Sequence, residues 1–378
     1  MSLRYKLLFM AMMVTALAFG FLNVLAPYDG VRFARLHIFL FNLCAGCTIL
    51  LYYSDQKTFL TPRVKAFLFL SILYAVSAFL EVYLPALLAT PALIAIVEIV
   101  RIRRFRFLPI DFFKKSVPVS DKFHHAALLC LSIGLLIAGL VIVDSAYYPF
   151  MTIPKLELNM FFLGYSFPLS LITMSLIFSI MKTPSGHAGS LKNAAFWTIN
   201  LGVIIFFGFI LAEVFIPQLV VTLVLFASVA IVFYLFVRLG ENLQQKQFLI
   251  SGMGFLVVTA ASGIAYILVE FTLDHYSEAL VWLMRIHSFS ALYGWNLCGL
   301  AIICRNNDFP IQLHSKSAIA LHWATVLVLA PLGTAHPAMA VIATFAYAGY
   351  LYIVLFAKTE NAGMGKRLEA GSESVLSG

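Results

Sequence analysis

Twelve apolar runs, most of them separated from the next by a short polar segment, limit what this chain of 378 residues can fold into. A helix that crosses a bilayer needs about 20 apolar residues, and the runs are close to that length. They cover 7–26, 33–53, 66–83, 84–100, 125–143, 158–181, 194–214, 217–238, 248–271, 279–304, 317–334 and 337–356. Because lipid offers no partner for backbone N–H and C=O groups, apolar runs of this length form helices. We therefore predict an all-α integral membrane protein with about twelve transmembrane helices.

The composition supports this prediction, since 62% of the residues are hydrophobic and only 11% are charged. A soluble domain has about 25% charged residues. The third and fourth runs are short and meet at Leu84-Pro85, so a re-entrant hairpin is an alternative to two spans there. We expect one polytopic domain over residues 1–358 and a disordered cytoplasmic tail over residues 359–378.

The positions of the basic residues predict the orientation. Most of the 25 Lys and Arg residues fall on the same side of the predicted membrane as the N-terminus, many of them in "RIRRFRFLPIDFFKKSVPVSDK", residues 101–122. Short cytoplasmic loops carry the excess of Lys and Arg, so both termini should be cytoplasmic. The net charge of +8 is thus a topology signal, and we expect membrane lipid rather than nucleic acid around the chain. The expected location is the inner, cytoplasmic membrane of a bacterial cell.

Two short stretches place an arginine and a histidine inside apolar runs, where ionisable groups are costly and usually functional. They are "ARLHIF", with Arg35 and His37, and "MRIHSF", with Arg285 and His287, and both read R-x-H-x-F. Both runs cross the membrane in the same direction, so the two imidazoles should lie at similar depth in its outer half. Two axial imidazoles are what a six-coordinate haem iron needs. The pattern leads to the hypothesis that His37 and His287 bind one haem b.

The arginines require a separate explanation, because residues two apart lie about 200° apart around a helix. Arg35 and Arg285 should therefore face away from the pocket of the histidines. Glu81, Glu213 and Glu270 lie at the outer ends of other runs. Two alternatives follow: the arginines form structural ion pairs with these glutamates, or these residues line a second cavity that binds a cofactor such as a quinone.

Other polar residues in the runs carry weaker predictions. His322, in "LHWA", is either a buried structural group or a member of a cofactor site or proton relay. Cys44 and Cys47 form "CAGC", which we interpret as small residues at a helix contact rather than as a redox or metal site.

The chain resembles subunit I of the haem–copper oxidases and nitric-oxide reductases. The segment "RIHSFSALYGWNLCGLAI" is similar to the H-x-H-x-x-A-L-x-G run of that family, with His287 at the second histidine. In the family, a histidine on helix two and this histidine on helix ten bind the low-spin haem. The resemblance thus implies that His37 and His287 are haem ligands. The first histidine of the motif, which holds the active-site haem, is replaced here by Arg285.

The runs 158–181 and 194–214 contain no histidine, although the copper site of that family needs histidines on its sixth and seventh helices. A copper centre is therefore not expected. The NnrS proteins, haem- and copper-containing membrane proteins of the bacterial nitric-oxide response, are a second candidate family. Their G-H-T-G motif resembles "SGHAGS" at Gly186, His187 and Gly189, although their early H-A-H-E-M motif is missing. A Gly/Ser-rich cytoplasmic turn is the alternative interpretation.

The leading prediction is a haem b-binding membrane protein that acts in electron transfer or in nitric oxide, oxygen or quinone chemistry. Because no soluble redox domain is recognisable, electrons would come from a quinone or a redox partner subunit. Two alternatives belong to other classes. They are a twelve-span secondary transporter, although no duplicated halves are visible, and a membrane enzyme of lipid metabolism, which would use the adjacent His124 and His125 together with Glu98.

Overall fold

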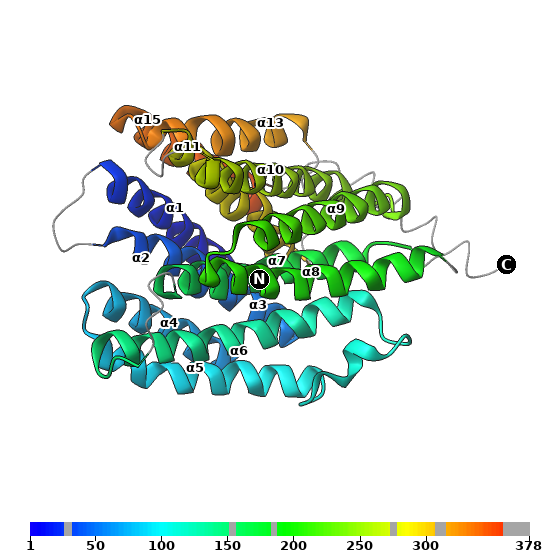
Figure 1. The fold of residues 1–378 in the computed structure, drawn as a ribbon, viewed down its shortest axis with the longest axis horizontal. Coiled ribbons are helices and arrows are strands. Elements are labelled where there is room, and N and C mark those ends of the chain that lie inside the picture. The colour runs from blue at the N-terminus through cyan, green and yellow to red at the C-terminus, as the bar shows by residue number, and fades with distance from the viewer. Residues whose placement is uncertain (26–31, 151–155, 183–186, 273–277, 307–314, 358–378) are drawn as a thin grey trace.

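The computed structural model is a bundle of long helices (Figure 1). It describes residues 1–25, 32–150, 156–182, 187–272, 278–306 and 315–357. Within these residues there is no β-strand, and one isolated bridge joins Met181 to Gly240. The predicted tail 359–378 lies outside the described residues.

The described residues form long helices, three of which contain π-helical turns. In chain order the elements are α1 (Leu3–Leu25), α2 (Phe33–Ile38), η1 (Phe39–Cys47), α3 (Thr48–Ser54), α4 (Pro62–Phe79), α5 (Tyr83–Arg104), η2 (Pro109–Phe113), α6 (Val119–Ala146), α7 (Leu156–Ser179), α8 (His187–Ala212), α9 (Phe215–Leu239), α10 (Gln244–Thr272), α11 (Glu278–Phe289), η3 (Ser290–Asn296), α12 (Leu297–Cys304), α13 (Lys316–Ala324), η5 (Thr325–Leu329), α14 (Ala330–Gly333) and α15 (Pro337–Phe356). Three continuous helices are composite: Phe33–Ser54, Glu278–Cys304 and Lys316–Gly333.

Among the described residues, 11 helices are long and apolar enough to cross a membrane. A further apolar helix, Gly164–Ser179, is shorter and belongs to α7. The prediction of an all-α, multi-pass membrane protein is therefore confirmed. The helices α4 and α5, of 18 and 22 residues, are both among the 11, which favours two spans over a re-entrant hairpin at Leu84-Pro85. A tight turn joins them, with Glu81 in the left-handed region at φ 58°.

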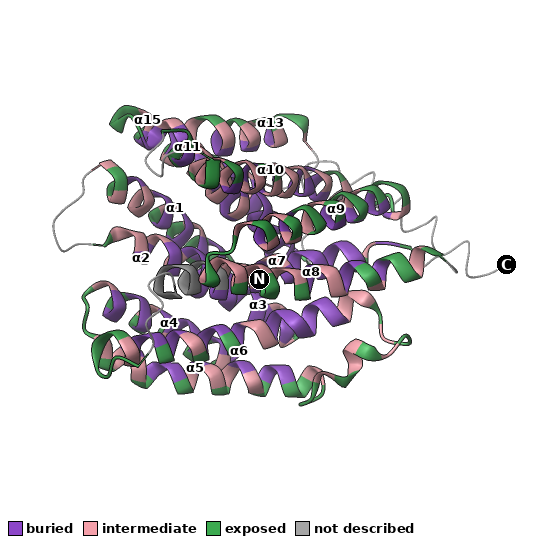
Figure 2. Ribbon diagram, viewed as in Figure 1, coloured by how far each residue is buried: buried purple, intermediate pink, exposed green. Residues whose placement is uncertain are grey.

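The outer surface of the bundle is apolar. Large hydrophobic side chains such as Phe69, Leu88, Ile204 and Phe345 are more than half exposed, and Figure 2 shows exposed residues along the peripheral helices. A soluble monomer rarely exposes apolar surface on this scale, whereas lipid would cover it. The surface therefore agrees with a location in a membrane.

The two R-x-H-x-F helices lie at the centre of the bundle. In the most apolar part of Phe33–Ser54 and of Glu278–Cys304, 83% and 78% of the residues are buried, compared with 28% in α8 and in α9. In Figure 1, the helices α4, α5 and α6 lie on one side of this centre, and α10, α13 and α15 lie on the other. His37 and His287 are therefore carried by the two most enclosed of these helices.

Each of the three candidate histidines lies two or three residues before a π-helical segment. His37 precedes η1, His287 precedes η3, and His322 precedes η5. These are the π-helical segments among the described residues. A π-turn shifts the helix face by one residue and often occurs at functional sites. This coincidence, which the sequence does not reveal, singles out the same three residues.

Candidate functional site

His37 lies in a close-fitting seat on α1. Its Nδ1 is 2.9 Å from the backbone oxygen of Ala16. A Cβ atom added to Gly20, one turn further along α1, would lie 2.7 Å from the same nitrogen. The imidazole therefore occupies the space that the missing side chain of Gly20 leaves, and it donates from Nδ1 to the carbonyl one turn earlier.

His287 lies in a seat of the same construction on α10. Its Nδ1 is 2.9 Å from the backbone oxygen of Thr259. A Cβ atom added to Gly263 would lie 3.2 Å from Nδ1 and from Cε1 of His287. In both seats the carbonyl and the glycine are four residues apart, so they lie on one face of the supporting helix.

The two seats leave the two imidazoles in the same chemical state. When Nδ1 donates to a backbone carbonyl, Nε2 carries the lone pair. The structure describes no hydrogen bond to Nε2 of His37 or His287. Histidines that bind metals usually donate their other ring N–H to a carbonyl or carboxylate, which fixes the tautomer. Both residues therefore have the tautomer of an Nε2 ligand.

Tyr293 connects these two helices. It lies on the same composite helix as His287, and its hydroxyl oxygen is 3.0 Å from Nδ1 of His37. The Tyr293 ring packs against the rings of Phe41 at 4.9 Å and Tyr347 at 5.1 Å. No direct contact between the two imidazoles is described, so the structure brings the helices together through Tyr293. No feature of the sequence singles out this residue.

His322 has a different environment, in which both ring nitrogens are occupied. Its Nε2 donates to the backbone oxygen of Tyr293 at 2.7 Å, and its Nδ1 accepts from the hydroxyl of Tyr350 at 2.9 Å. The ring is fully buried and stacks on Tyr350 with centroids 4.2 Å apart. Of the two alternatives for His322, this geometry favours the structural group.

Arg35 is buried and points toward the turn between α4 and α5. Its Nη1 donates to the carbonyl of Ala78 at 2.8 Å, to Glu81 at 3.1 Å and to the Tyr83 hydroxyl at 3.1 Å. Arg35 and Glu81 therefore form an ion pair, which is the first of the two alternatives considered for the arginines. Since His37 faces α1 instead, the expected separation of Arg35 from His37 is also present.

Arg285 does not form the corresponding ion pair. Its guanidinium lies over the ring of Trp282, 5.2 Å from the centroid, and no salt bridge to it is described among the resolved positions. Glu213 lies in the tight turn between α8 and α9, with φ 54°, and Glu270 lies in the last turn of α10. The structure thus joins Arg35 to Glu81, whereas no ion pair of Arg285 with Glu213 or Glu270 is described.

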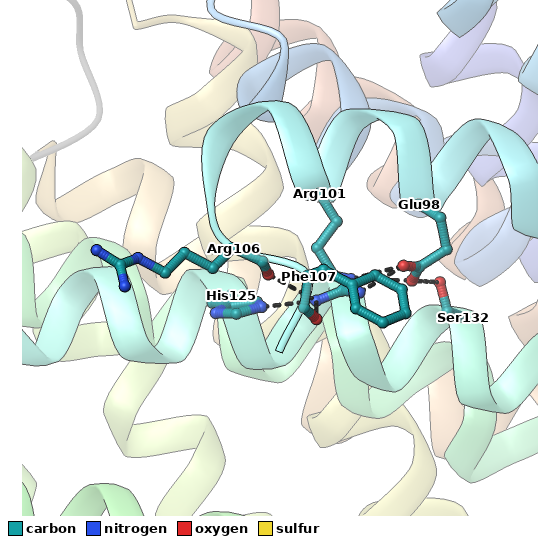
Figure 3. Close-up of polar contacts among 6 residues, drawn as sticks. All are labelled: Glu98, Arg101, Arg106, Phe107, His125 and Ser132. Atoms are coloured by element: carbon teal, nitrogen blue, oxygen red, sulfur yellow. Dashed lines mark hydrogen bonds and ion pairs between the residues drawn. The ribbon is translucent and has the colours of Figure 1, made fainter. Parts of the chain in front are cut away.

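A second polar cluster lies at the opposite end of the bundle, on α5 and α6 (Figure 3). Arg101 is 2% exposed. Its Nε donates to both carboxylate oxygens of Glu98, at 2.9 and 3.0 Å, and Ser132 donates to the same carboxylate at 2.6 Å. The Nη1 atom of Arg101 lies 2.8 Å from Nε2 of His125. Because arginine only donates, His125 accepts at Nε2 and carries its proton on Nδ1.

This cluster fixes the segment that follows α5. Nη1 of Arg101 also donates to the carbonyls of Arg106 and Phe107, at 3.2 and 2.9 Å. Phe105 stacks on His125 with centroids 4.8 Å apart. The adjacent His124 is equally buried, and its Nε2 lies 2.7 Å from the Ser54 hydroxyl. The two histidines are therefore enclosed, and their described contacts are those of a structural element.

His187, from the motif that resembles G-H-T-G, is the first residue of α8, and its side chain is exposed. It lies apart from the buried histidines, and residues 183–186 of the motif are outside the described part. Cys44 and Cys47 are buried and unbonded to each other. Next to them, the Cβ position of Gly46 is filled by Leu169 of α7. This close packing of Leu169 on Gly46 agrees with the interpretation of "CAGC" as small residues at a helix contact.

The described residues contain no group of three or more His, Cys, Asp or Glu side chains arranged to hold a metal ion. A haem iron with two axial imidazoles needs only two protein ligands, so this finding does not bear on the His37–His287 hypothesis. No protein-family model, curated protein or solved structure matches the chain.

Proposed function

We propose that the protein is a haem b-binding protein of the bacterial inner membrane, with His37 and His287 as the axial ligands. The observation that carries the proposal is the matched construction of the two seats. Each imidazole donates from Nδ1 to a backbone carbonyl at 2.9 Å and lies on a glycine four residues beyond that carbonyl. Two histidines that are held in the same way on two different helices support one shared role.

The surroundings are apolar and aromatic, as a haem would require. Phe289 packs against Phe21 at 6.2 Å and against Tyr293 at 5.9 Å, so aromatic rings lie between α1 and the composite helix of His287. The glycines at positions 20 and 263 keep the two imidazoles close to their supporting helices. Such a haem supplies one-electron transfer when bound. The residues of this chain would orient the two imidazole rings through the carbonyls of Ala16 and Thr259 and would surround the haem with apolar side chains.

The proposal does not include a copper centre, because the helices α7 and α8 contain no histidine on their membrane-spanning parts. We infer that electrons come from a quinone or from a redox partner subunit, since the chain contributes no soluble redox domain. Membrane lipid is the remaining partner. The proposed role of the haem is electron transfer or a reaction of nitric oxide, oxygen or a quinone.

The optical spectrum and the haem content of the purified protein test the proposal. After expression with sufficient haem, the wild-type protein should contain about one haem b per chain and show a low-spin spectrum. His37→Ala and His287→Ala should each lose the low-spin signal, because one remaining ligand leaves a five-coordinate iron or none. His187→Ala, a substitution at an exposed histidine, is the control and should leave the spectrum unchanged.

The same measurement separates the proposal from the transporter and the lipid-metabolism enzyme. Neither of these needs haem. A folded, monodisperse protein without haem would contradict the proposal and return the two alternatives to first place.

A further inference from the structure

Two neighbouring layers of polar side chains in the C-terminal helices differ in their hydrogen bonding. In the first layer, His322 donates to the carbonyl of Tyr293 and accepts from the hydroxyl of Tyr350, at 2.7 and 2.9 Å. All three residues are at most 1% exposed. Both nitrogens of His322 are therefore paired, as expected for a polar ring in a membrane interior.

The second layer lies one helical turn away. The composite helix of Tyr293 and α15 run in the same direction, while the composite helix of His322 runs opposite to both, since successive spans alternate. A residue three positions before Tyr293 or Tyr350 is therefore level with the residue three positions after His322. The residues at these positions are Ser290, Thr325 and Tyr347. The segments η3 and η5 pack on each other, as do η5 and α15, and the Tyr347 ring contacts the Tyr293 ring.

Every hydroxyl of this second layer is buried without a partner. Ser290 and Tyr347 are 0% exposed and Thr325 is 1% exposed. Among the described residues, none of their three oxygen atoms has a hydrogen-bond partner. We call Ser290, Thr325 and Tyr347 the hydroxyl layer.

Among the described residues, the hydroxyl of Thr48 is also buried without a partner, on another helix, but several other buried hydroxyls are paired. Thr90, Thr173 and Thr259 each donate to the carbonyl four residues earlier, at 2.8–2.9 Å. Ser290 and Thr325 differ from them because each is the first residue of a π-helical segment. Two of the three hydroxyls of the layer, Ser290 and Thr325, thus lie where neighbouring helices depart from α-helical geometry, while Tyr347 lies within α15.

We propose that the hydroxyl layer binds one internal water molecule. An unpaired buried hydroxyl is costly, and three at one level require a common partner. A buried water typically makes about three hydrogen bonds to groups that have no other partner, and the hydroxyl layer supplies three. The ligand is uncharged, because residues 286–304 and 317–357 contain no charged side chain. The bound water joins three helices, and the proposal does not depend on haem.

Radiolytic hydroxyl-radical labelling of the full chain in nanodiscs tests the proposal directly. Radicals form from water, so a buried side chain is modified only when a water lies against it. Tyr347 should be modified several-fold faster than Tyr165, which is equally buried and whose hydroxyl bonds to that of Tyr74. Equal, slow modification of Tyr347 and Tyr165 would overturn the proposal.

Substitutions give a second and independent result. Tyr347→Phe and Thr325→Val each remove one hydroxyl with little change in volume. With a bound water, each should lower Tm by about 2–4 °C, and the double variant should lose less than the sum, because both hydroxyls share one partner. Thr90→Val is the control, since its hydroxyl bonds within its own helix, and its Tm should change less. If both hydroxyls lack water, each substitution removes an unpaired polar group and Tm should rise, which would contradict the proposal.

Discussion

The hydroxyl oxygen of Tyr293 and the backbone oxygen of Ala16 both lie about 3 Å from the same atom, Nδ1 of His37 (3.0 and 2.9 Å). Because the carbonyl oxygen of Ala16 only accepts, Nδ1 carries the proton, and the hydroxyl oxygen of Tyr293 accepts from the same N–H. The neutral imidazole then has its lone pair on Nε2, the atom that would bind a metal. His287 has one such contact, to the carbonyl of Thr259.

Tyr293→Phe should therefore raise the midpoint potential of the proposed haem. A hydroxyl oxygen that accepts from Nδ1–H makes the imidazole more basic, which stabilises the oxidised iron. Without the hydroxyl this stabilisation is lost, whereas the aromatic ring and the contact with Ala16 remain. A redox titration followed at the low-spin absorption band measures the shift. Tyr83→Phe, which changes a hydroxyl beside Arg35 instead, is the control. A potential that is unchanged in Tyr293→Phe would show that the tyrosine does not act on His37.

Gly20→Ala should displace His37, because the added Cβ would lie 2.7 Å from Nδ1. The neighbouring atom belongs to a ring that is itself held by a hydrogen bond, so it cannot shift freely. We expect loss of most of the low-spin signal. Gly208→Ala is the matched control, since no atom lies within 4 Å of the added Cβ. This control should be neutral or stabilise the helix by up to about 1 kcal/mol. A normal haem spectrum in Gly20→Ala would contradict the description of the seat.

Arg35→Gln should destabilise the protein without changing a haem spectrum. The substitution removes hydrogen bonds from a buried charged group to Ala78, Glu81 and Tyr83, and we expect a loss of about 2–3 kcal/mol. Arg285→Gln should cost less, because that guanidinium is described only over Trp282. Denaturation in mild detergent, followed by fluorescence, compares the two variants. Loss of activity in Arg35→Gln at normal stability would instead favour the second cavity.

Arg101→Gln should loosen the segment 105–113. The side chain is 2% exposed and donates to Glu98, His125 and two backbone carbonyls. Removing one partner of a buried ion pair costs about 3–5 kcal/mol. Limited proteolysis should cut Arg101→Gln within this segment faster than the wild-type protein. Arg103→Gln changes an exposed neighbour and should leave the rate unchanged. Equal cleavage rates in both variants would show that Arg101 does not fix the segment.

The number and type of the helices could be predicted because the thickness of a bilayer determines how long an apolar run must be. The boundaries were less accurate. The helix α6 begins at Val119 and α8 at His187, whereas the predicted runs began at 125 and 194. Hydropathy locates the part of a helix that lies in hydrocarbon. The backbone remains helical beyond it, through Lys122 and Lys192.

The candidate site was predicted only in part. His37 and His287 were selected because an ionisable group in an apolar run is conspicuous, and the structure places them in matching seats. Tyr293 was missed because a tyrosine is unremarkable in such a run and its contact with His37 spans 256 residues. The π-helical segments were also missed, since a single extra residue in one turn leaves the apolar pattern unchanged. The predicted partners of Arg285 were not found with it, because sequence places side chains at a depth but not around a bundle.

The most direct test of the central claim is the electron paramagnetic resonance spectrum of the oxidised protein at low temperature. If His37 and His287 are the two axial ligands of one haem, the wild-type protein should give a low-spin ferric signal. His37→Ala should replace it with a high-spin signal or with none. A low-spin signal of unchanged shape and intensity in His37→Ala, or the absence of haem from a folded wild-type protein, would contradict the account.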